Sequence, residues 1–393
     1  MRIAVDGSCW ANRRGFGRFT RCLVTEMVRR DTANTYVLLI DESSLSAPDV
    51  APLPTGVEVQ SVAVGAAPAR AAAASGARSL VDVLRMSAAV PRLRSDVFFF
   101  PASYSYFPVL GPPVVVTVHD AIAERLPHLT LPTRADRLRW RLKQAAALRQ
   151  AAAVITVSGA SRRAIEETLG VASDRLHVIR EAADPVFRPL ADAEREARLR
   201  RFGAVARSPY LLYVGGISPH KNLEVLIEAF ARIALAHPDL RLLVAGDTDD
   251  DPFFSSLDSI RAVLAASPVR ERVCLLGFVS DDELVALYGG AVATALPSLG
   301  EGFGLTAAES AACATPVVTS DDAALVELLG DAGLTAPATS VEGFAGHFSR
   351  LVGDPGHRAA MAEAVRRKAD EWSWAATADQ TVAILEQAAS GRG

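Results

Sequence analysis

Short apolar runs alternate with segments of helical spacing along most of the chain. The apolar runs of the first half are RIAVDG, TYVLLID, VEVQSVAV, DVFFFP, VVVTVHD and AVITVS. After about residue 190 the alternation begins again, with YLLYVGG, LRLLVAGD, RVCLLGF, VATALPS and PVVTSD. Strands that are apolar on both faces and alternate with helices form parallel sheets covered on both sides. The pattern therefore predicts an α/β protein of two Rossmann-like domains, whose parallel sheets face a central cleft that binds a ligand at the carboxyl ends of the strands.

The length of the chain agrees with two domains, because 393 residues exceed what one hydrophobic core usually organises. We predict a first domain over residues 1–190 and a second over residues 191–372, joined within the charged stretch 189–209. The Ala-rich residues 66–74 predict a mobile loop.

Composition excludes several classes of protein. A formal net charge of −4 argues against a nucleic-acid partner. The four cysteines are far apart without a CxxC pair, which indicates reduced thiols and no zinc site. The chain opens on a strand pattern rather than a secretion signal, and no apolar run reaches the roughly 18 residues of a membrane span. We expect a cytoplasmic location.

The stretch EGFGLTAAES, residues 301–310, carries the most specific chemistry. It follows an apolar run at residues 292–296 that predicts a buried strand, and it opens an Ala-rich predicted helix. One carboxylate, Glu301, then lies in the loop, and the other, Glu309, lies about one turn into the helix. Carboxylates accept hydrogen bonds from sugar hydroxyls, and the free N–H groups of a helix N-terminus bind phosphate. The stretch predicts a site for a ligand that is both sugar and phosphate.

Two further segments place polar groups where predicted strands end. VTVHD places His119 and Asp120 after a strand, where a parallel sheet carries functional groups. YVGGISPHKN places Gly215, Gly216 and Lys221 between a strand and an amphipathic helix. Lysine is rare in this chain, and Lys221 suits a phosphate contact.

Two motifs resemble cofactor or metal sites only in part. GFGRFT, from Gly15 through Gly17 to Thr20, lacks the third glycine of a dinucleotide fingerprint, so we predict a Gly-rich loop before a helix rather than an NAD(P) site. DTDDDP, residues 247–252, lacks the glycine and the distal glutamate of a calcium loop, so we predict a solvated turn. No metal ligands are predicted.

Aromatic and basic segments suggest two surfaces. Tyr104, Tyr106 and Phe107 follow a predicted strand end, and with Asp120 they are candidates for an acceptor pocket. RADRLRWRLK, from Arg134 to Lys143, predicts a helix with a solvated basic face, and it is also a candidate for peripheral contact with the inner face of a membrane.

Taken together, these segments resemble the retaining glycosyltransferases of family 4, the glycosyl transferases group 1 with the GT-B fold. The resemblance covers nearly the whole chain. It rests on GFGRFTRCL, VHD, TVSGASRRAI, YVGGISPHKN, LLGFVSDDELVALYGGA, PSLGEGFGLTAAESAACATPVVTSD and the late WSWAATADQTVAILEQ. In that family the last segment is a terminal helix, here about residues 373–393, that returns to the acceptor-binding first domain, while the second domain binds the donor.

The resemblance implies roles for individual residues. His119 would contact the donor sugar near the reacting carbon, Glu301 would bind sugar hydroxyls, and Lys221 would neutralise the diphosphate in place of a metal ion. Glu309 would hold the ribose. The remaining donor-site positions implied by the resemblance are Gly15, Gly17, Gly215, Gly216, Phe278, Val279, Gly302, Phe303, Gly304 and Leu305.

The sequence departs from the family at two positions. Gly216 stands where many relatives carry an arginine, so we expect Lys221, helped by Arg18, to carry more of the charge opposite the diphosphate. Glu181 and Ala182 replace a usual Asn-Gly pair, which we expect to reshape the interdomain hinge.

The resemblance implies transfer of a sugar from a nucleotide-diphosphate sugar to a hydroxyl acceptor by same-face attack, without a cofactor or metal. Two alternatives share the architecture, namely a nucleotide-sugar 2-epimerase and a non-catalytic nucleotide-sugar binding protein. Sugar, base, acceptor and oligomeric state stay open.

Overall fold

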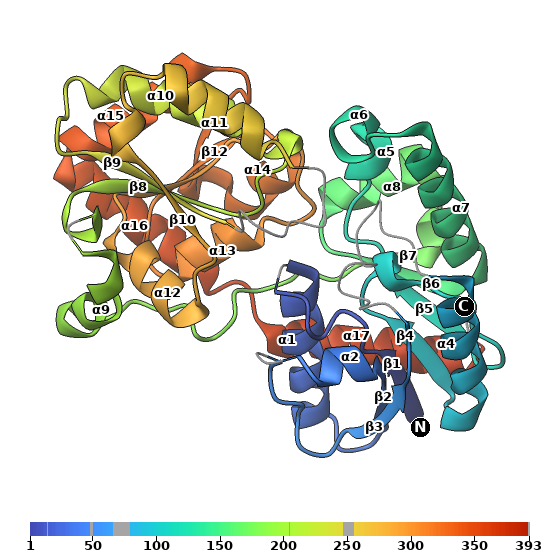
Figure 1. Cartoon of the computed structure of the whole chain (residues 1–393). Helices are drawn as coiled ribbons and strands as arrows, with labels where there is room; N and C mark the ends of the chain where they lie inside the picture. Colours follow the sequence, from blue (N-terminus) through green and yellow to red (C-terminus); the bar gives the residue numbers. More distant parts are fainter. Residues whose placement is uncertain (14, 48–49, 66–78, 204, 247–254, 392–393) are drawn as a thin grey trace. The chain divides into compact units, whose positions relative to one another are not determined.

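The computed structural model describes the chain except residues 14, 48–49, 66–78, 204, 247–254 and 392–393. It divides into two compact units, one formed by residues 1–181 and 373–393 and the other by residues 182–372 (Figure 1). The chain passes from the first unit to the second after residue 181, earlier than the predicted boundary at residue 190. The Ala-rich loop predicted at residues 66–74 and the acidic turn predicted at residues 247–252 lie outside the described residues.

Unit 1 contains a seven-stranded sheet in which every neighbouring pair is parallel, with the order β3-β2-β1-β4-β5-β6-β7. Its strands are β1 (Arg2–Asp6), β2 (Thr35–Asp41), β3 (Glu58–Val62), β4 (Val97–Phe100), β5 (Val114–Thr117), β6 (Ala151–Thr156) and β7 (Leu176–Val178). Its helices are α1 (Gly15–Arg30), α2 (Glu42–Leu45), α4 (Leu80–Leu93), η1 (Ser103–Ser105), α5 (Ile122–Arg125), α6 (Pro127–Thr130), α7 (Arg134–Gln150), α8 (Gly159–Leu169), η2 (Ser173–Arg175) and α17 (Trp374–Ala389).

Unit 2 contains a six-stranded parallel sheet with the order β10-β9-β8-β11-β12-β13. Its strands are β8 (Tyr210–Val214), β9 (Arg241–Ala245), β10 (Val273–Gly277), β11 (Ala293–Leu296), β12 (Val317–Ser320) and β13 (Leu334–Ala336). Its helices are α9 (Asp192–Arg198), η3 (Arg200–Phe202), η4 (Val205–Arg207), η5 (Pro219–Lys221), α10 (Leu223–Ala234), α11 (Leu257–Ala266), η6 (Arg270–Arg272), α12 (Asp281–Gly290), α13 (Leu305–Ala312), α14 (Ala323–Leu329), η7 (Gly330–Ala332), α15 (Val341–Gly353) and α16 (Pro355–Ala369).

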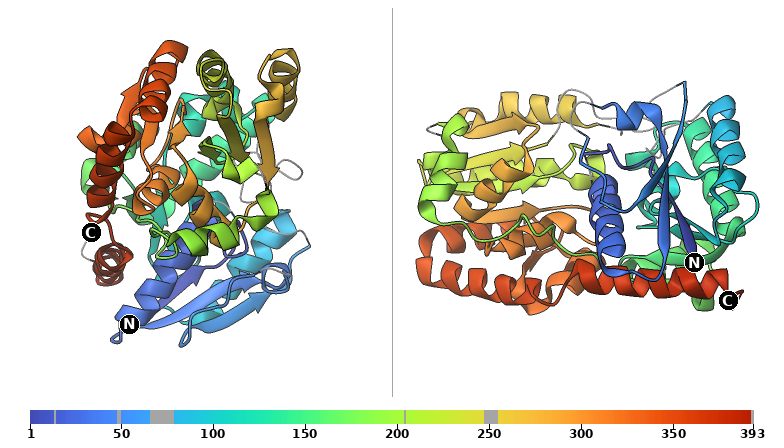
Figure 2. Two further views of the ribbon diagram at one scale, coloured as in Figure 1. Left: turned by 90° about the vertical axis from the view of Figure 1, so that its left-hand side faces the viewer. Right: turned by 90° about the horizontal axis from the view of Figure 1, so that it is seen from below.

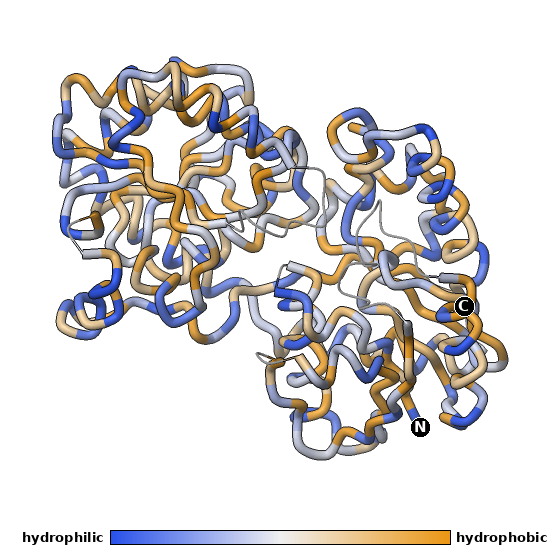
Figure 3. The backbone as a smooth tube through the Cα atoms, viewed as in Figure 1, coloured by the Kyte–Doolittle hydropathy of each residue, from blue (hydrophilic) through white to orange (hydrophobic). Residues whose placement is uncertain are grey.

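The central strands are buried on both faces, which is why their sequences are mostly apolar, with small buried Thr and Ser residues, and do not alternate. All four residues of β4 are fully buried, and so are those of β11 and β12. Figure 3 shows hydrophobic colour along many of the strands, while the helices mix hydrophobic and hydrophilic colour. Burial on both faces requires helices on both sides of each sheet, as the doubly wound pattern predicts.

The terminal helix α17 belongs to unit 1. It packs against α1, which crosses it in the right-hand view of Figure 2, and also contacts β4, β5 and β6. Trp374 at its start contacts the ring of Phe19 in α1, with centroids 5.8 Å apart. A segment distant in sequence thus completes the helical layer over this sheet.

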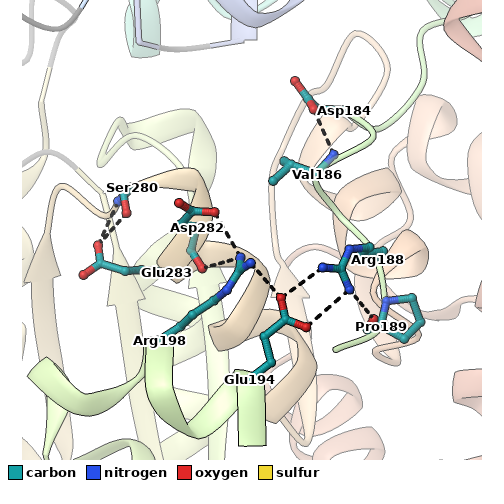
Figure 4. A network of polar contacts seen from close by, with 9 residues as sticks. All are labelled: Asp184, Val186, Arg188, Pro189, Glu194, Arg198, Ser280, Asp282 and Glu283. Carbon is teal, nitrogen blue, oxygen red and sulfur yellow. Dashed lines mark hydrogen bonds and ion pairs between the residues drawn. The ribbon is translucent and has the colours of Figure 1, made fainter. Parts of the chain in front are cut away.

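The charged stretch predicted to join the domains contains the helix α9 and folds onto unit 2. Glu194 in α9 accepts hydrogen bonds from Arg188, at 3.0 Å, and from Arg198, at 2.8 Å (Figure 4). Arg198 also reaches Asp282 in the first turn of α12, at 3.0 Å. This network ties α9 to the helix that follows the Phe278 loop.

Candidate functional site

The loops after β8 and β11 bring Lys221 and Glu301 together in unit 2. Lys221 Nζ donates to Glu301 Oε1 over 2.7 Å, and Ser298 Oγ donates to the same oxygen over 2.7 Å. Burial alone would raise the pKa of Glu301, but the Lys221 ammonium and these hydrogen bonds hold it below the ordinary value. Glu301 is therefore a buried, compensated carboxylate.

His220, next to this pair, is uncharged near neutral pH. Burial, together with the neighbouring Lys221 ammonium, lowers the pKa of His220 to about 4. The positive charge at this position in the loop therefore belongs to Lys221 alone.

The helix α13 begins at Leu305, after the short loop that carries Glu301, and presents open donors at its N-terminus. Its N-cap, Gly304, has a φ of +97° and no capping side chain. Among the residues that the structure describes, the N–H groups of Leu305 and Thr306 donate to no protein acceptor. A Cβ at position 304 would lie 2.6 Å from Cδ2 of Leu325, so both the backbone conformation and the packing require glycine here. The loop exposes a partial positive charge suited to an anion.

Glu309 is the second carboxylate of the stretch and lies in α13. It is only 5% exposed, and Tyr288 in α12 donates its hydroxyl to Glu309 Oε2 over 2.9 Å. This bond fixes one carboxylate oxygen and the orientation of the side chain.

The other predicted donor-site positions lie at strand ends of the same sheet. Gly215 follows β8 with a φ of +150°, and its carbonyl oxygen would lie 2.2 Å from a Cβ on Gly246. Gly216 accepts a hydrogen bond from Tyr213, at 2.7 Å. Phe278 and Val279 follow β10, with Phe278 49% exposed and Val279 9% exposed. Phe303 is 5% exposed and contacts Trp372 edge to face.

In unit 1, His119 follows β5 as predicted but is enclosed by protein. Its ring is 6% exposed and meets Phe16 and Phe19 edge to face. Nδ1 lies 3.0 Å from Glu181 Oε1, and Nε2 lies 2.9 Å from the carbonyl oxygen of Pro101. Both ring nitrogens are thus occupied by the protein, so a direct hydrogen bond to a sugar requires one of them to change partner.

The expectation of a Gly-rich loop before the first helix is wrong, because α1 begins at Gly15 and includes Gly17. A Cβ on Gly17 would lie 1.8 Å from the carbonyl oxygen of Asn12. Close approach of the preceding turn therefore explains this glycine without any ligand.

The aromatic acceptor candidates divide into core and non-core residues. Phe107 is fully buried between Phe98 and Phe100, so its proposed place in a pocket wall is wrong. Tyr106 is 9% exposed and donates its hydroxyl to Gln150. Its ring is part of the same core.

Tyr104 stacks between Phe16 and Trp140, with centroids 4.4 and 4.8 Å away. Asp120 accepts a hydrogen bond from the backbone N–H of Ile122. Tyr104 and Asp120 are both partly exposed, and they remain acceptor candidates.

The basic segment from Arg134 to Lys143 lies in α7, as predicted. Leu138 and Leu142 on this helix are 59% and 63% exposed, while Trp140 is buried. In the described part of the chain, no helix combines the length and apolar character needed to cross a bilayer. Within the same residues, no three His, Cys, Asp or Glu side chains are grouped so as to hold a metal ion.

Sequence reasoning missed the residues that support these carboxylates. Tyr288 and Ser298 lie in the quoted segments, but no role was predicted for them, because the contact from Tyr288 to Glu309 spans two helices and the one from Ser298 to Glu301 depends on how the loop folds. The Glu181 position was noted only as a departure from the family. No local signal connects it to His119, which lies 62 positions earlier.

The comparisons with known proteins agree with the two-sheet architecture. Residues 194–368 match the family described as Glycosyl transferases group 1. Residues 13–187 match the one described as Glycosyltransferase Family 4. The fold is that of the GT-B glycosyltransferases, and the family match together with the relatives named below shows a hexosyltransferase. The chain belongs to the group 1, family 4 glycosyltransferases.

Curated relatives include three transferases of different named specificity. The α-D-kanosaminyltransferase of Streptomyces kanamyceticus is 27% identical over 74% of this chain and 74% of its own length. The D-inositol 3-phosphate glycosyltransferase of Corynebacterium aurimucosum is 30% identical over 71% of this chain and 67% of its own length. The O-antigen chain mannosyltransferase B of Escherichia coli is 29% identical over 63% of this chain and 64% of its own length.

Solved structures share the fold at low identity. Sucrose-phosphate synthase from Thermosynechococcus elongatus superposes with a TM-score of 0.80 at 19% identity, covering 100% of both chains. The Anabaena protein HepE, solved in complex with UDP-glucose, gives 0.76 at 19% identity over 98% of this chain and 100% of its own. At these identities the likeness establishes the fold alone.

Proposed function

We propose that this glycosyltransferase moves a sugar from a nucleoside-diphosphate sugar to an acceptor hydroxyl and retains the anomeric configuration. The observation that carries the proposal is the Lys221–Glu301 pair, 2.7 Å apart, beside the uncapped N-terminus of α13. An ammonium and open N–H groups suit a diphosphate, and a carboxylate suits sugar hydroxyls. The Anabaena relative in fold was solved with UDP-glucose, which supports a donor of this class.

Within the donor, Lys221 and the N–H groups of α13 would take the diphosphate and Glu301 the sugar hydroxyls. Glu309, oriented by Tyr288, would take the ribose. Phe278 and Val279 would flank the base. We assign the donor to unit 2, and the acceptor to unit 1 near Tyr104 and Asp120.

In the chemical step, the acceptor attacks the anomeric carbon from the same face from which the leaving group departs. The acceptor oxygen forms a bond to the anomeric carbon while the bond from that carbon to the diphosphate oxygen breaks, and the acceptor proton passes to the departing phosphate. Glu301 is paired with Lys221 and is therefore a poor nucleophile, which disfavours a covalent intermediate. Lys221 stabilises the negative charge that develops on the diphosphate, the role that a metal ion fills in other transferases.

The proposal is tested with a panel of UDP-, GDP-, TDP- and ADP-sugars, first by thermal shift and then by transfer to hydroxyl acceptors. We expect one nucleotide to stabilise the protein, Glu309→Ala to abolish most of that stabilisation, and proton NMR to find the product with the donor's anomeric configuration. Transfer is expected to persist in excess EDTA. An inverted product would overturn the mechanism, and loss of transfer in EDTA would overturn the role given to Lys221.

The same assay separates the two alternative functions. A 2-epimerase converts the donor without an acceptor, and a sensor binds a nucleotide sugar without turnover. Either result would remove the acceptor step from the proposal.

A further inference from the structure

The His119 ring is held on all sides by residues of unit 1. Phe19 meets it with centroids 4.6 Å apart and an interplanar angle of 84°, and Phe16 meets it at 5.1 Å and 61°. Its Nδ1 partner, Glu181, is 3% exposed. A buried carboxylate is unfavourable without a partner, so this contact has an energetic reason beyond ring packing.

The partners of the ring determine where its protons lie. The Pro101 carbonyl oxygen can only accept a hydrogen bond, so Nε2, 2.9 Å away, must carry a proton. The contact between Nδ1 and Glu181 Oε1, 3.0 Å, needs a second proton between two groups that otherwise repel each other through their lone pairs. The pair therefore binds one proton more than a carboxylate beside a neutral imidazole. We place that proton on Nδ1, which then donates to Glu181 Oε1 and leaves Glu181 a carboxylate.

We propose that Glu181 is a positioning residue that keeps His119 doubly protonated, with its Nε2–H available to move from the Pro101 carbonyl oxygen to an oxygen of the bound substrate. This inference rests on the proposed function for the identity of that substrate, a nucleoside-diphosphate sugar or its hydroxyl acceptor. A cationic imidazole donates a stronger hydrogen bond than a neutral one, because charge-assisted bonds are about twice as strong.

The location of the pair in the fold supports this role. His119 follows β5 and Pro101 follows β4, which are neighbouring parallel strands, so both lie at the carboxyl edge of the sheet, where α/β proteins bind ligands. Glu181 is the last residue before the chain leaves unit 1, and the carbonyl of Arg180 accepts a hydrogen bond from Thr377 of α17, at 2.7 Å. The backbone that carries the carboxylate is thereby anchored at this edge.

Glu181→Gln is the decisive variant, because its amide can donate to an unprotonated Nδ1 and so preserve both contacts of the ring while removing the cation. The measurement is ¹⁵N NMR of histidine-labelled full-length protein near neutral pH, with His119 assigned by its loss in His119→Phe. We expect both ring nitrogens protonated in the wild type, and only Nε2 protonated in Glu181→Gln. An unprotonated Nδ1 in the wild type would overturn the proposal without any activity measurement.

Steady-state kinetics supply the second readout. We expect kcat of Glu181→Gln to fall about tenfold, with donor KM little changed, because only the strength of one charge-assisted bond is lost. The matched control is Glu363→Gln, which alters an exposed carboxylate in α16 and is expected to leave both constants unchanged. Full kcat in Glu181→Gln would overturn the positioning role. If the wild type transfers no sugar from any donor, the proposed function fails, while the NMR result still decides the protonation of His119.

Discussion

Lys221 and Glu301 form an ion pair over 2.7 Å although 80 positions separate them in the chain. They meet because β8 and β11 are adjacent parallel strands, so the loops that follow their carboxyl ends lie side by side. In this pair each charge compensates the other. A diphosphate and a sugar would compete for the two partners, so donor binding and the ion pair are linked.

Replacing Lys221 by methionine is expected to impair both catalysis and folding. Glu301 would remain as a buried carboxylate without its cation, which raises the pKa of Glu301 and destabilises the protein by about 3 kcal/mol. We expect kcat to fall at least about a hundredfold through loss of charge stabilisation at the leaving group. Chemical denaturation and initial-rate kinetics measure the two effects.

The double variant Lys221→Met/Glu301→Gln separates these effects. Removing both charges should recover most of the stability and none of the activity, because no buried charge is then left unpaired. Recovery of activity with stability would mean that Lys221 acts only on folding.

Tyr288→Phe removes a hydroxyl that donates to Glu309 Oε2 and that we expect to orient this carboxylate. We expect donor KM to rise several-fold with kcat nearly unchanged, together with a stability loss of about 1 kcal/mol, the usual net value of a hydrogen bond. Tyr106→Phe is the matched control, since it removes a hydroxyl that donates to Gln150 in unit 1. Equal KM changes in both variants would contradict an orienting role for Tyr288.

Gly304→Ala is expected to destabilise the protein by about 2 kcal/mol, because a Cβ would both occupy a left-handed backbone conformation and collide with Leu325. The control variant is Gly346→Ala, which adds a Cβ on the exposed face of α15, where the space around it is open. That control should be neutral or stabilise by about 0.5–1 kcal/mol. Thermal unfolding of the two variants side by side tests the difference, and equal melting temperatures would refute it.

Glu124→Gln should stabilise the protein at alkaline but not at acid pH. Burial raises the pKa of Glu124 to about 7, from an ordinary value of 4.5. A raised carboxyl pKa means that the folded state holds the proton while the unfolded state releases it, so stability falls as pH rises from 4.5 to about 7. A glutamine side chain can still accept the hydrogen bond from Trp140 Nε1, and it cannot ionise.

We expect Glu124→Gln to gain about 3 kcal/mol over the wild type above pH 7 and nothing below pH 4.5. Denaturation curves measured across this range for both proteins test the sign. A gain that does not depend on pH would show that the carboxyl group does not titrate as stated.

The hydrophobic pattern alone predicted the fold class, because burial of a strand on both faces is visible in its own sequence, as in VFFF of β4 or VVTS of β12. The Glu301 loop and the helix that carries Glu309 could be predicted for a similar reason, since a short loop and a helix start depend on adjacent residues. Gly304 was part of that local signal. Gly17 was misread, because the residue that excludes its Cβ, Asn12, is recognised only once the turn before α1 is known.

The order of the strands in each sheet decided which of the predicted side chains contact one another. Which side chains meet at the carboxyl edge depends on which strands are neighbours, and no local pattern contains that information. Lys221 therefore reaches Glu301, and His119 reaches Glu181, only in the folded sheet. The same packing removes Phe107 from any pocket and makes Tyr288 the partner of Glu309. The sequence determined the kinds of groups present at each strand end, and the tertiary structure determined their pairs, because hydrogen bonds and ion pairs act over a few ångströms of space rather than along the chain.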